Sequence, residues 1–402
     1  MKPRRYLPRL EKPSPALAPQ QRSTKIGPAE ASGGPPTFAV MNRRWPIVVA
    51  TAAALVLVPV AIAARPVAAF HQSAAELADR VRASATVPWS GLVETTGTLQ
   101  LPDSASFANL AQLMGDSNRL RVWWRGADDW RVDRIRSTGE RDLFQNGGRS
   151  IRWVFESQSA TISPVSTVRL PDAYDVLPTV LARSMLQAAR ENELTRLPAR
   201  RVAGIDAPGL RLVPHEEGTT IAHVDLWADP QTGLALQVEL YGVTDRRPVL
   251  NTTVVDFHRG LPPATTTRFV PAAGVKLAYE DSIDVAAAAN AFAAYDLPIS
   301  VAGLPSRTGS DPGAVGTYGR GPTTVFVLAL RAQVAGPLRR QLRASPSAQR
   351  TQVGTISSVG PIGLLVTPGR FGPLEPGGGF LLAGTVTSEV LERAAGQLLA
   401  GP

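Results

Sequence analysis

Alternating apolar and polar residues mark the middle of this chain as β-structure. Residues 89–101 place apolar side chains on one side of a predicted strand and polar ones on the other, and residues 120–124 continue this alternation. The segment 126–129 is a turn signal. Asn-Gly-Gly at 146–148 is typical of a hairpin, and the strand after it places the aromatic residues of 151–155 on one face. Together these segments predict an antiparallel meander.

Two helices are predicted beside these strands. Ser73 and Glu76 form a capping-box pattern that starts a short helix ending near residue 85. Residues 173–194 have helical periodicity, and their apolar side consists of Leu177, Val180, Leu181, Met185 and Leu186. Four more strands are predicted at 209–213, 221–228, 234–241 and 249–257. A tight turn at 229–233, which contains Pro and Gly, joins the middle two.

The composition changes beyond residue 259. Residues 259–280 are predicted as an extended connection, followed by an Ala-rich stretch at 285–294. Gly and Pro are abundant in 303–322 and 361–379. The predicted elements here are strands at 324–330, 363–366 and 380–386 and a last helix that begins at Thr387 or Ser388 and ends at Leu399. Residues 295–402 therefore predict a second, small αβ unit.

The N-terminal part contains one long apolar segment. Residues 45–64 carry no charge and lie between Arg44 and Arg65. At about 1.5 Å per helical residue, this length matches a hydrocarbon core of roughly 30 Å. The basic, Pro-rich residues 1–44 are predicted to be a disordered tail on the cytoplasmic side, because Lys and Arg favour that side. Residues past about 65 are then expected to lie outside the cytoplasm.

The same segment also fits a cleaved signal peptide. If the chain starts at Met41, it offers a short basic stretch, an apolar run and an Ala61-x-Ala63 cleavage motif. Anchor and signal peptide both remain open, as does the choice between Met1 and Met41 as the start. Export is predicted in either case.

The charge distribution argues against nucleic-acid binding. The net charge is +9, but residues 1–44 alone hold nine Lys or Arg against two Glu, which leaves only +2 for the rest of the chain. A basic tail on a near-neutral body lacks the basic face that nucleic acids require. There is no cysteine, so disulfides and thiolate metal sites are excluded.

Motifs for catalysis are missing from the sequence. There is no G-x-S-x-G, no H-E-x-x-H and no P-loop. His223 and Asp225 share one face of a predicted strand but have no third ligand nearby, so they are interpreted as a surface pair. The paired carboxylates at 128–129 and 216–217 fall in predicted turns and are expected to be solvated. We expect no enzyme activity, no cofactor and no metal site.

Tryptophan is concentrated on the predicted strands. Five of the seven tryptophans lie between residues 89 and 153. They could fill the core, or an incompletely closed sheet could use them to line an apolar cavity for an acyl chain. Adjacent Trp123 and Trp124 must face opposite sides of their strand. The predicted ligand-binding residues are Trp89, Trp124, Trp130, Trp153 and Trp227.

Several short motifs resemble the MucB/RseB and LolA group of envelope proteins. The motifs are Pro88-Trp-Ser-Gly91, the hairpin 120–132, Val202-Ala-Gly204, the strand–turn–strand segment 224–238, and, near the C-terminus, 315–320 and 380–387. The apolar N-terminal segment and the Gly/Pro-rich insertion at 361–379 depart from that group.

The resemblance implies an α+β fold. Residues 70–280 would form a LolA/RseB-like antiparallel half-barrel wrapped on helices, and residues 295–402 a small RseB-like C-terminal αβ domain. It also implies a non-enzymatic, extracytoplasmic lipid-binding sensor that regulates a membrane partner such as an anti-sigma factor, with a lipid or lipopeptide as its hydrophobic ligand. One alternative is a LolA-like carrier of lipids or lipoproteins. A second is an exported enzyme with an unrecognised site.

Overall fold

A computed structural model of the chain describes residues 48–53, 55, 65–99, 108–137, 139–165, 171–279, 297–307, 315–369 and 378–401. The chain divides into two units, Met1–Arg65 and Pro66–Pro402, and the fold described below belongs to the second. The predicted tail at 1–44 and most of the predicted apolar span at 45–64 lie outside the described residues. Within the described part of the chain, no helix combines the length and apolarity needed to cross a membrane.

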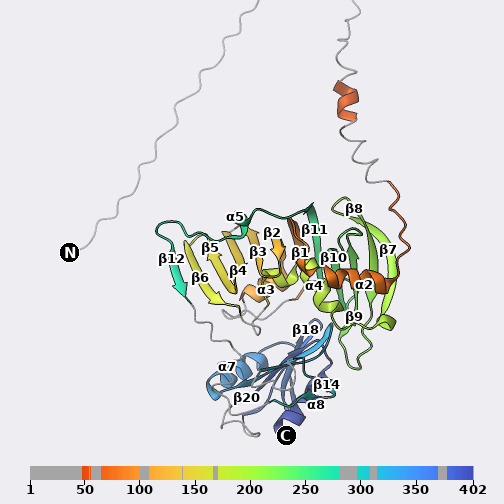
Figure 1. Cartoon of the computed structure of the whole chain (residues 1–402). Coiled ribbons are helices and arrows are strands. Elements are labelled where there is room, and N and C mark those ends of the chain that lie inside the picture. The colour runs from red at the N-terminus through yellow and green to blue at the C-terminus, as the bar shows by residue number, and fades with distance from the viewer. Residues whose placement is uncertain are drawn as a thin grey trace, which may run out of the picture. The chain divides into compact units, whose positions relative to one another are not determined.

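One large sheet of twelve strands dominates the second unit (Figure 1). Its strand order is β12-β6-β5-β4-β3-β2-β1-β11-β10-β9-β8-β7. The strands are β1 (Trp89–Gly97), β2 (Ser117–Gly126), β3 (Asp129–Arg136), β4 (Gly139–Asn146), β5 (Arg149–Val154), β6 (Ser159–Pro164), β7 (Leu194–Val202), β8 (Ile205–Leu212), β9 (Ile221–Ala228), β10 (Ala235–Gly242), β11 (Leu250–Arg259) and β12 (Lys276–Tyr279). β1 pairs with both β2 and β11, so it joins two meanders into one open sheet.

Short helices cover part of this sheet. α2 (Ala74–Ala83) begins with the predicted Ser73–Glu76 capping box and packs on β8. The predicted helix at 173–194 is instead three pieces, η2 (Ala173–Val176), α4 (Pro178–Leu186) and η3 (Glu191–Glu193). Pro at the first position of α4 starts a new helix, because Pro cannot donate the backbone bond that would continue the previous turn. α4 packs on β10 and on α2.

Several elements of the large sheet and its cover were not predicted. Residues 259–280, expected to be an extended connection, contain the short helix α5 (Ala264–Thr267) and β12. β12 pairs in parallel with β6 and is exposed along its whole length, so no burial alternation marked it as a strand. Helix α3 (Ala108–Gly115) was also missed. The Ala-rich stretch at 285–294 lies outside the described residues.

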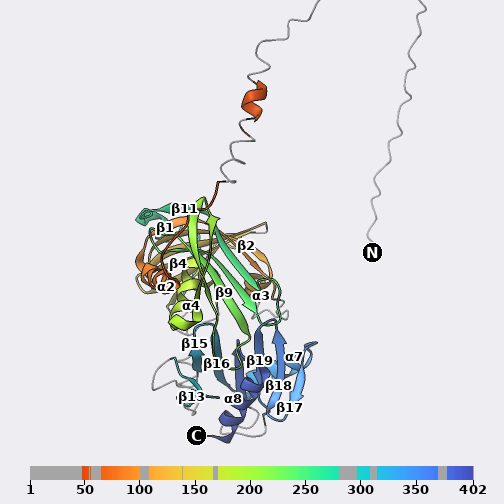
Figure 2. The same cartoon turned by 90° about the vertical axis from the view of Figure 1, so that its right-hand side faces the viewer.

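A second sheet has six strands in the order β15-β16-β20-β19-β18-β17 (Figure 2). Its strands are β15 (Val315–Arg320), β16 (Thr323–Leu330), β17 (Gln349–Thr351), β18 (Gly354–Val359), β19 (Ile362–Val366) and β20 (Gly379–Gly384). Two short strands, β13 (Ser300–Val301) and β14 (Leu304–Pro305), pair separately. Helices α7 (Ala332–Arg343) and α8 (Ser388–Ala400) pack on the six-stranded sheet.

Sequence patterns located part of this second sheet correctly. The predicted strands that became β16, β19 and β20 are confirmed, as is the last helix, whose N-cap is Thr387. β15, β17, β18 and α7 were not predicted. α7 is amphipathic, but Gly336 and Pro337 in its interior are residues that usually interrupt a helix, and they obscured its signal in the sequence.

Direct contacts join the two sheets. The guanidinium of Arg320, at the end of β15, donates from Nη2 to Oε1 of Glu193 (2.6 Å) and also pairs with Glu216. A backbone bond runs from Thr387 N–H to the carbonyl of Gly218 (2.7 Å). Glu216, predicted to be a solvated turn carboxylate, is therefore part of a shared ion cluster.

The ion cluster holds Glu193 in its charged form. Burial alone would raise the pKa of Glu193, but hydrogen bonds from Arg320 and from the backbone N–H groups of Arg190 and His215 outweigh burial and lower it to about 2. A carboxylate that accepts several charged and backbone donors is stabilised as the anion. This contact therefore supports the folded protein above about pH 4.5 and is lost as the pH falls towards 2.

Candidate functional site

The strand register builds a row of tryptophans on one face of the large sheet. Trp89 lies opposite Trp124, and Trp124 lies opposite Trp130. The rings of Trp124 and Trp130 are stacked, with centroids 5.9 Å apart and an interplanar angle of 5°. Tyr174, from η2, packs on Trp130 with a centroid distance of 4.6 Å. The face that carries this row, here called the inner face, is the one beneath η2.

The structure places the five predicted ligand-binding tryptophans in different surroundings. Trp89, Trp124, Trp130 and Trp227 are buried in one apolar cluster. Trp227 donates its indole N–H to the carbonyl of Pro198 (3.0 Å) and lies under Arg200. Trp153 is half-buried, lies on the opposite, outer face, and packs on Phe269 at 5.8 Å. The role of these residues in ligand binding stays a prediction.

Trp123 points away from the row, as its position next to Trp124 requires. It lies on the outer face between two cations, with the guanidinium carbons of Arg121 and Arg131 at 5.8 and 5.1 Å from its ring. Trp123 and Trp124 therefore lie on opposite faces of the sheet at neighbouring positions of β2.

Polar groups without partners accompany the tryptophan row. Arg183, from α4, lies over Trp124 with its guanidinium carbon 5.6 Å from the ring. Its Nη1, Oγ1 of Thr179 and Nε1 of Trp89 are buried, and none of them has a hydrogen-bond partner among the described residues. Buried donors are nearly always paired in folded proteins, so three such donors near one row require an explanation.

A surface pocket of about 360 Å³ lies on the other half of the large sheet. It is lined by the segment 67–73 together with residues of α2, β7 and β8, among them Phe70, Leu77, Leu197 and Gly209. Gly209 also contacts the ring of Trp227, because a Cβ at this position would lie 2.6 Å from the indole nitrogen. Trp227 thus backs this pocket and is separate from the Trp89–Trp124–Trp130 row.

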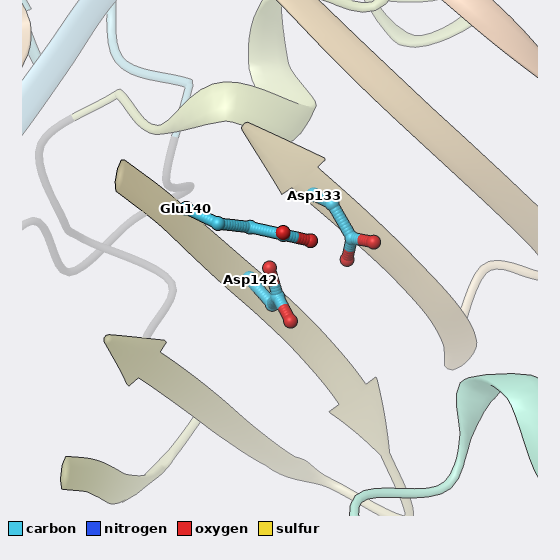
Figure 3. Close-up of side chains that lie close together, drawn as sticks. All are labelled: Asp133, Glu140 and Asp142. Atoms are coloured by element: carbon cyan, nitrogen blue, oxygen red, sulfur yellow. The ribbon is translucent and has the colours of Figure 1, made fainter. Parts of the chain in front are cut away.

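The outer face holds a cluster of carboxylates that sequence reasoning missed (Figure 3). Asp133 of β3 lies opposite Asp142 of β4, and Glu140 follows on the same face. Their oxygens lie within 4.8 Å of one another, so by ligand type they could hold a metal ion. The two aspartates are far apart along the hairpin, and only its register brings them together.

Arg131 occupies one side of the cluster. Its Nε donates to Oδ1 of Asp133 (2.5 Å) and its Nη2 to Oδ2 of Asp142 (2.9 Å). Burial raises the pKa of Asp133 to about 6. Burial, together with the negative charge of Asp133, raises the pKa of Asp142 to about 7. The remaining oxygens, Asp133 Oδ2 and Asp142 Oδ1, accept no hydrogen bond from the described residues. This arrangement fits a retained proton near neutral pH.

The other candidate pair, His223 and Asp225, has a structural role. Arg211 binds both carboxylate oxygens of Asp225, at 2.6 and 2.7 Å. His223 is 3.9 Å from Asp225 and stacks on Tyr241 with a centroid distance of 4.3 Å. Burial lowers the pKa of His223, which favours the neutral ring. Both residues are thus held by protein contacts on one strand face.

Neither a protein-family model nor a curated protein sequence matches this chain. Several solved structures are similar to it. The Pseudomonas aeruginosa MucA/MucB complex is 17% identical over 80% of this chain and 96% of that chain, with a TM-score of 0.40. A LolA superfamily protein from Nitrosomonas europaea is 14% identical over 50% and 99% of the two chains, with a TM-score of 0.24. An uncharacterized conserved protein from Thermus thermophilus is 14% identical over 52% of this chain and 100% of that chain, with a TM-score of 0.33.

The neighbours named MucB and LolA belong to the two groups that the sequence motifs resemble. The predicted α+β class is confirmed, with a large, mostly antiparallel open sheet, few helices and a separate small sheet. TM-scores of 0.40 and below transfer no residue role and no activity from those proteins to this one.

The acidic cluster predicts a stability that falls with rising pH. The folded protein binds protons at Asp133 and Asp142 more tightly than the unfolded chain, whose carboxyls titrate near 3.8. Stability from these groups is therefore full below about pH 4 and is lost as the pH rises towards 7. The free energy of unfolding, measured by urea titration, should decrease between pH 5 and pH 8 in the unaltered chain. In Asp142→Asn this decrease should be smaller by about 2 kcal/mol.

The matched control for this test is Asp128→Asn, which changes an exposed turn residue. The control should keep the pH dependence of the unaltered chain. An unchanged pH dependence in Asp142→Asn would show that the cluster does not retain a proton.

Proposed function

We propose that this chain is a non-enzymatic, extracytoplasmic protein whose large sheet holds a hydrophobic ligand on its inner face. The observation that carries the proposal is the row of Trp89, Trp124 and Trp130. It lies on an open sheet and is covered by η2 and α4, which have only four and nine residues. An aromatic surface under such small elements can be uncovered at lower cost than a core sealed between two sheets. The ligand class is a lipid or a lipopeptide.

Ligand binding at this face can be sensed through α4. The carbonyl of Ala188, just after α4, accepts a hydrogen bond from Nη1 of Arg320 (2.7 Å). The same guanidinium binds Glu193 in η3. A shift of α4 to admit an acyl chain would therefore act on the residue that ties the six-stranded sheet to the large one. This connection supports a sensor in which ligand binding at the large sheet changes the contacts of the six-stranded sheet.

We propose a membrane-bound regulator, such as an anti-sigma factor, as the partner. The motifs that resemble the MucB/RseB group occur in both parts of the chain, at 224–238 and at 315–320 and 380–387. A single-domain carrier of lipids or lipoproteins, the LolA-like alternative, does not need the C-terminal part at residues 295–402. An exported enzyme is the remaining alternative, and turnover of any member of a hydrolase substrate panel would favour it.

The ligand hypothesis predicts saturable binding that depends on Trp124. Each buried methylene contributes roughly 0.8 kcal/mol, so a long acyl chain can bind through apolar contact. In calorimetry with palmitate in detergent-free buffer, Trp124→Leu should weaken binding at least about tenfold. The adjacent control Trp123→Leu changes the outer face and should bind as the unaltered chain does. If no saturable binding occurs, the tryptophans serve only as core.

Export is predicted from the charges that flank residues 45–64. A reporter that is active only outside the cytoplasm, fused after Leu399, should be active in cells. Activity of a cytoplasm-dependent reporter at the same position would contradict this topology. N-terminal sequencing of the mature protein separates the two export modes, because a start near Ala64 means cleavage.

Signal transfer is predicted to depend on Arg320. Palmitate should change the hydrogen exchange of residues 380–387 and the crosslinking of the chain to a membrane protein in cells. Arg320→Met should abolish both changes while palmitate still binds, because the link between α4 and β15 is lost. Arg246→Met, which removes an exposed arginine of the β10–β11 turn, serves as the control. If Arg320→Met responds like the control, coupling does not pass through this contact.

A further inference from the structure

Arg183, over the inner face, forms no ion pair with any carboxylate of the described residues. Burial is the sole influence on its pKa and lowers it, and no carboxylate among the described residues contributes. Its contact with the Trp124 ring stabilises a cation only in part. Isolated buried charges are strongly unfavourable, and proteins retain them mainly where a partner binds.

The two other buried donors without a described partner belong to residues that neighbour Arg183 on α4 or its contact Trp124 on the sheet. Thr179 precedes it by one helical turn, so both side chains emerge from the same side of α4. Trp89 is the direct cross-strand neighbour of Trp124, the ring on which Arg183 lies. Indole N–H and guanidinium can only donate, so the group that would satisfy them must accept hydrogen bonds.

On the six strands β1 to β6 acidic residues are confined to one face of the sheet, whereas arginines lie on both faces. All five acidic residues of these strands lie on the outer face, namely Glu94, Asp129, Asp133, Glu140 and Asp142. The inner face carries Arg134, Arg136, Arg141 and Arg152. Arg152 pairs with Asp172 and Arg134 with Gln112, while Arg134 Nε remains buried without a described partner. The inner face is thus apolar, aromatic and positive.

The geometry points to an anionic head-group site formed by Arg183, Thr179 and Trp89 beside the tryptophan row. Its ligand is an amphiphile that carries an acyl chain and a carboxylate or phosphate head. Arg183 binds the anion through its fork of N–H groups, and the neutral donors complete the anion's shell. The acyl chain lies along the apolar part of the inner face. This inference rests on the proposed ligand-binding function and adds the chemistry of the ligand's head.

The test compares three ligands that share one chain length, namely palmitate, hexadecyl phosphate and hexadecanol. Binding to the full chain is measured by calorimetry in detergent-free buffer. Both anions should bind at least about tenfold more tightly than the alcohol, because charge-assisted hydrogen bonds to a half-buried arginine are strong. The tighter of the two anions identifies the head group as carboxylate or phosphate.

The variant Arg183→Met keeps the length of the side chain and removes its charge. It should lose the preference for anions, bind hexadecanol unchanged and melt no lower than the unaltered chain, since a half-buried charge with no described counter-ion has been removed. Arg246→Met should keep the preference. Retained preference in Arg183→Met, or equal binding of all three ligands by the unaltered chain, would overturn the head-group site while leaving a lipid-binding protein. Failure of every ligand to bind would overturn the proposed function itself.

Discussion

The pairing register of β2, β3 and β4 is the constraint on which both candidate sites depend. It sets Trp124 opposite Trp130 on one face and Asp133 opposite Asp142 on the other. Side chains alternate with a period of two, so a slip of one residue would move the carboxylates into the tryptophan row. The turn between β4 and β5 fixes the next register along the sheet, because Gly147 and Gly148 adopt the positive φ values of 58° and 76° that this turn needs.

Both faces keep polar groups that a purely structural core would lack. On the inner face Arg183, Thr179 and Trp89 have buried donors without described partners. On the outer face Asp133 and Asp142 stand directly opposite each other, and their charge is offset in part by Arg131, which binds both, and by Arg121, which lies opposite Asp133. Like charges placed opposite each other destabilise a sheet, and unpaired buried donors destabilise the fold. Both sets of polar groups therefore lower the stability of the fold, and the proposed head-group site would account for those on the inner face.

Sequence signals that depend on neighbours in the chain predicted their elements well. The capping box of α2, the glycine hairpin at 146–148, the tight turn at 229–233 and the start of α8 at Thr387 all occur as expected. Gly233 has the positive φ, 76°, that the turn requires. Each of these features is decided by a few adjacent residues. β12, in contrast, exists because the exposed residues 276–279 find the free edge of β6, and no local pattern encodes that pairing.

The site was predictable only in its residue types. The alternation of side chains along β2 correctly predicted that Trp123 and Trp124 lie on opposite faces. It could not predict which residues of β5 lie on the same face of the sheet as Trp124. Trp153 was therefore grouped with the inner tryptophans, although it stands in the row of Asp142. Trp227 was grouped with them by residue type and belongs to the same buried cluster, yet it backs a separate pocket. The acidic cluster and the environment of Arg183 depend on cross-strand register and on helix docking, which a single sequence does not reveal.

The position of α4 explains how one small element can connect these features. Its Arg183 lies over the tryptophan row, and the carbonyl of Ala188 just beyond its end is bound by Arg320 of the six-stranded sheet. Arg320 is also held by Glu193, whose carboxylate stays ionised because backbone and guanidinium donors surround it. A nine-residue helix has little intrinsic stability and keeps its place mainly through such contacts. If a ligand binds beneath α4 as proposed, it would displace Arg183 from Trp124 and alter the contact between Ala188 and Arg320, which would couple the two sheets without a long pathway.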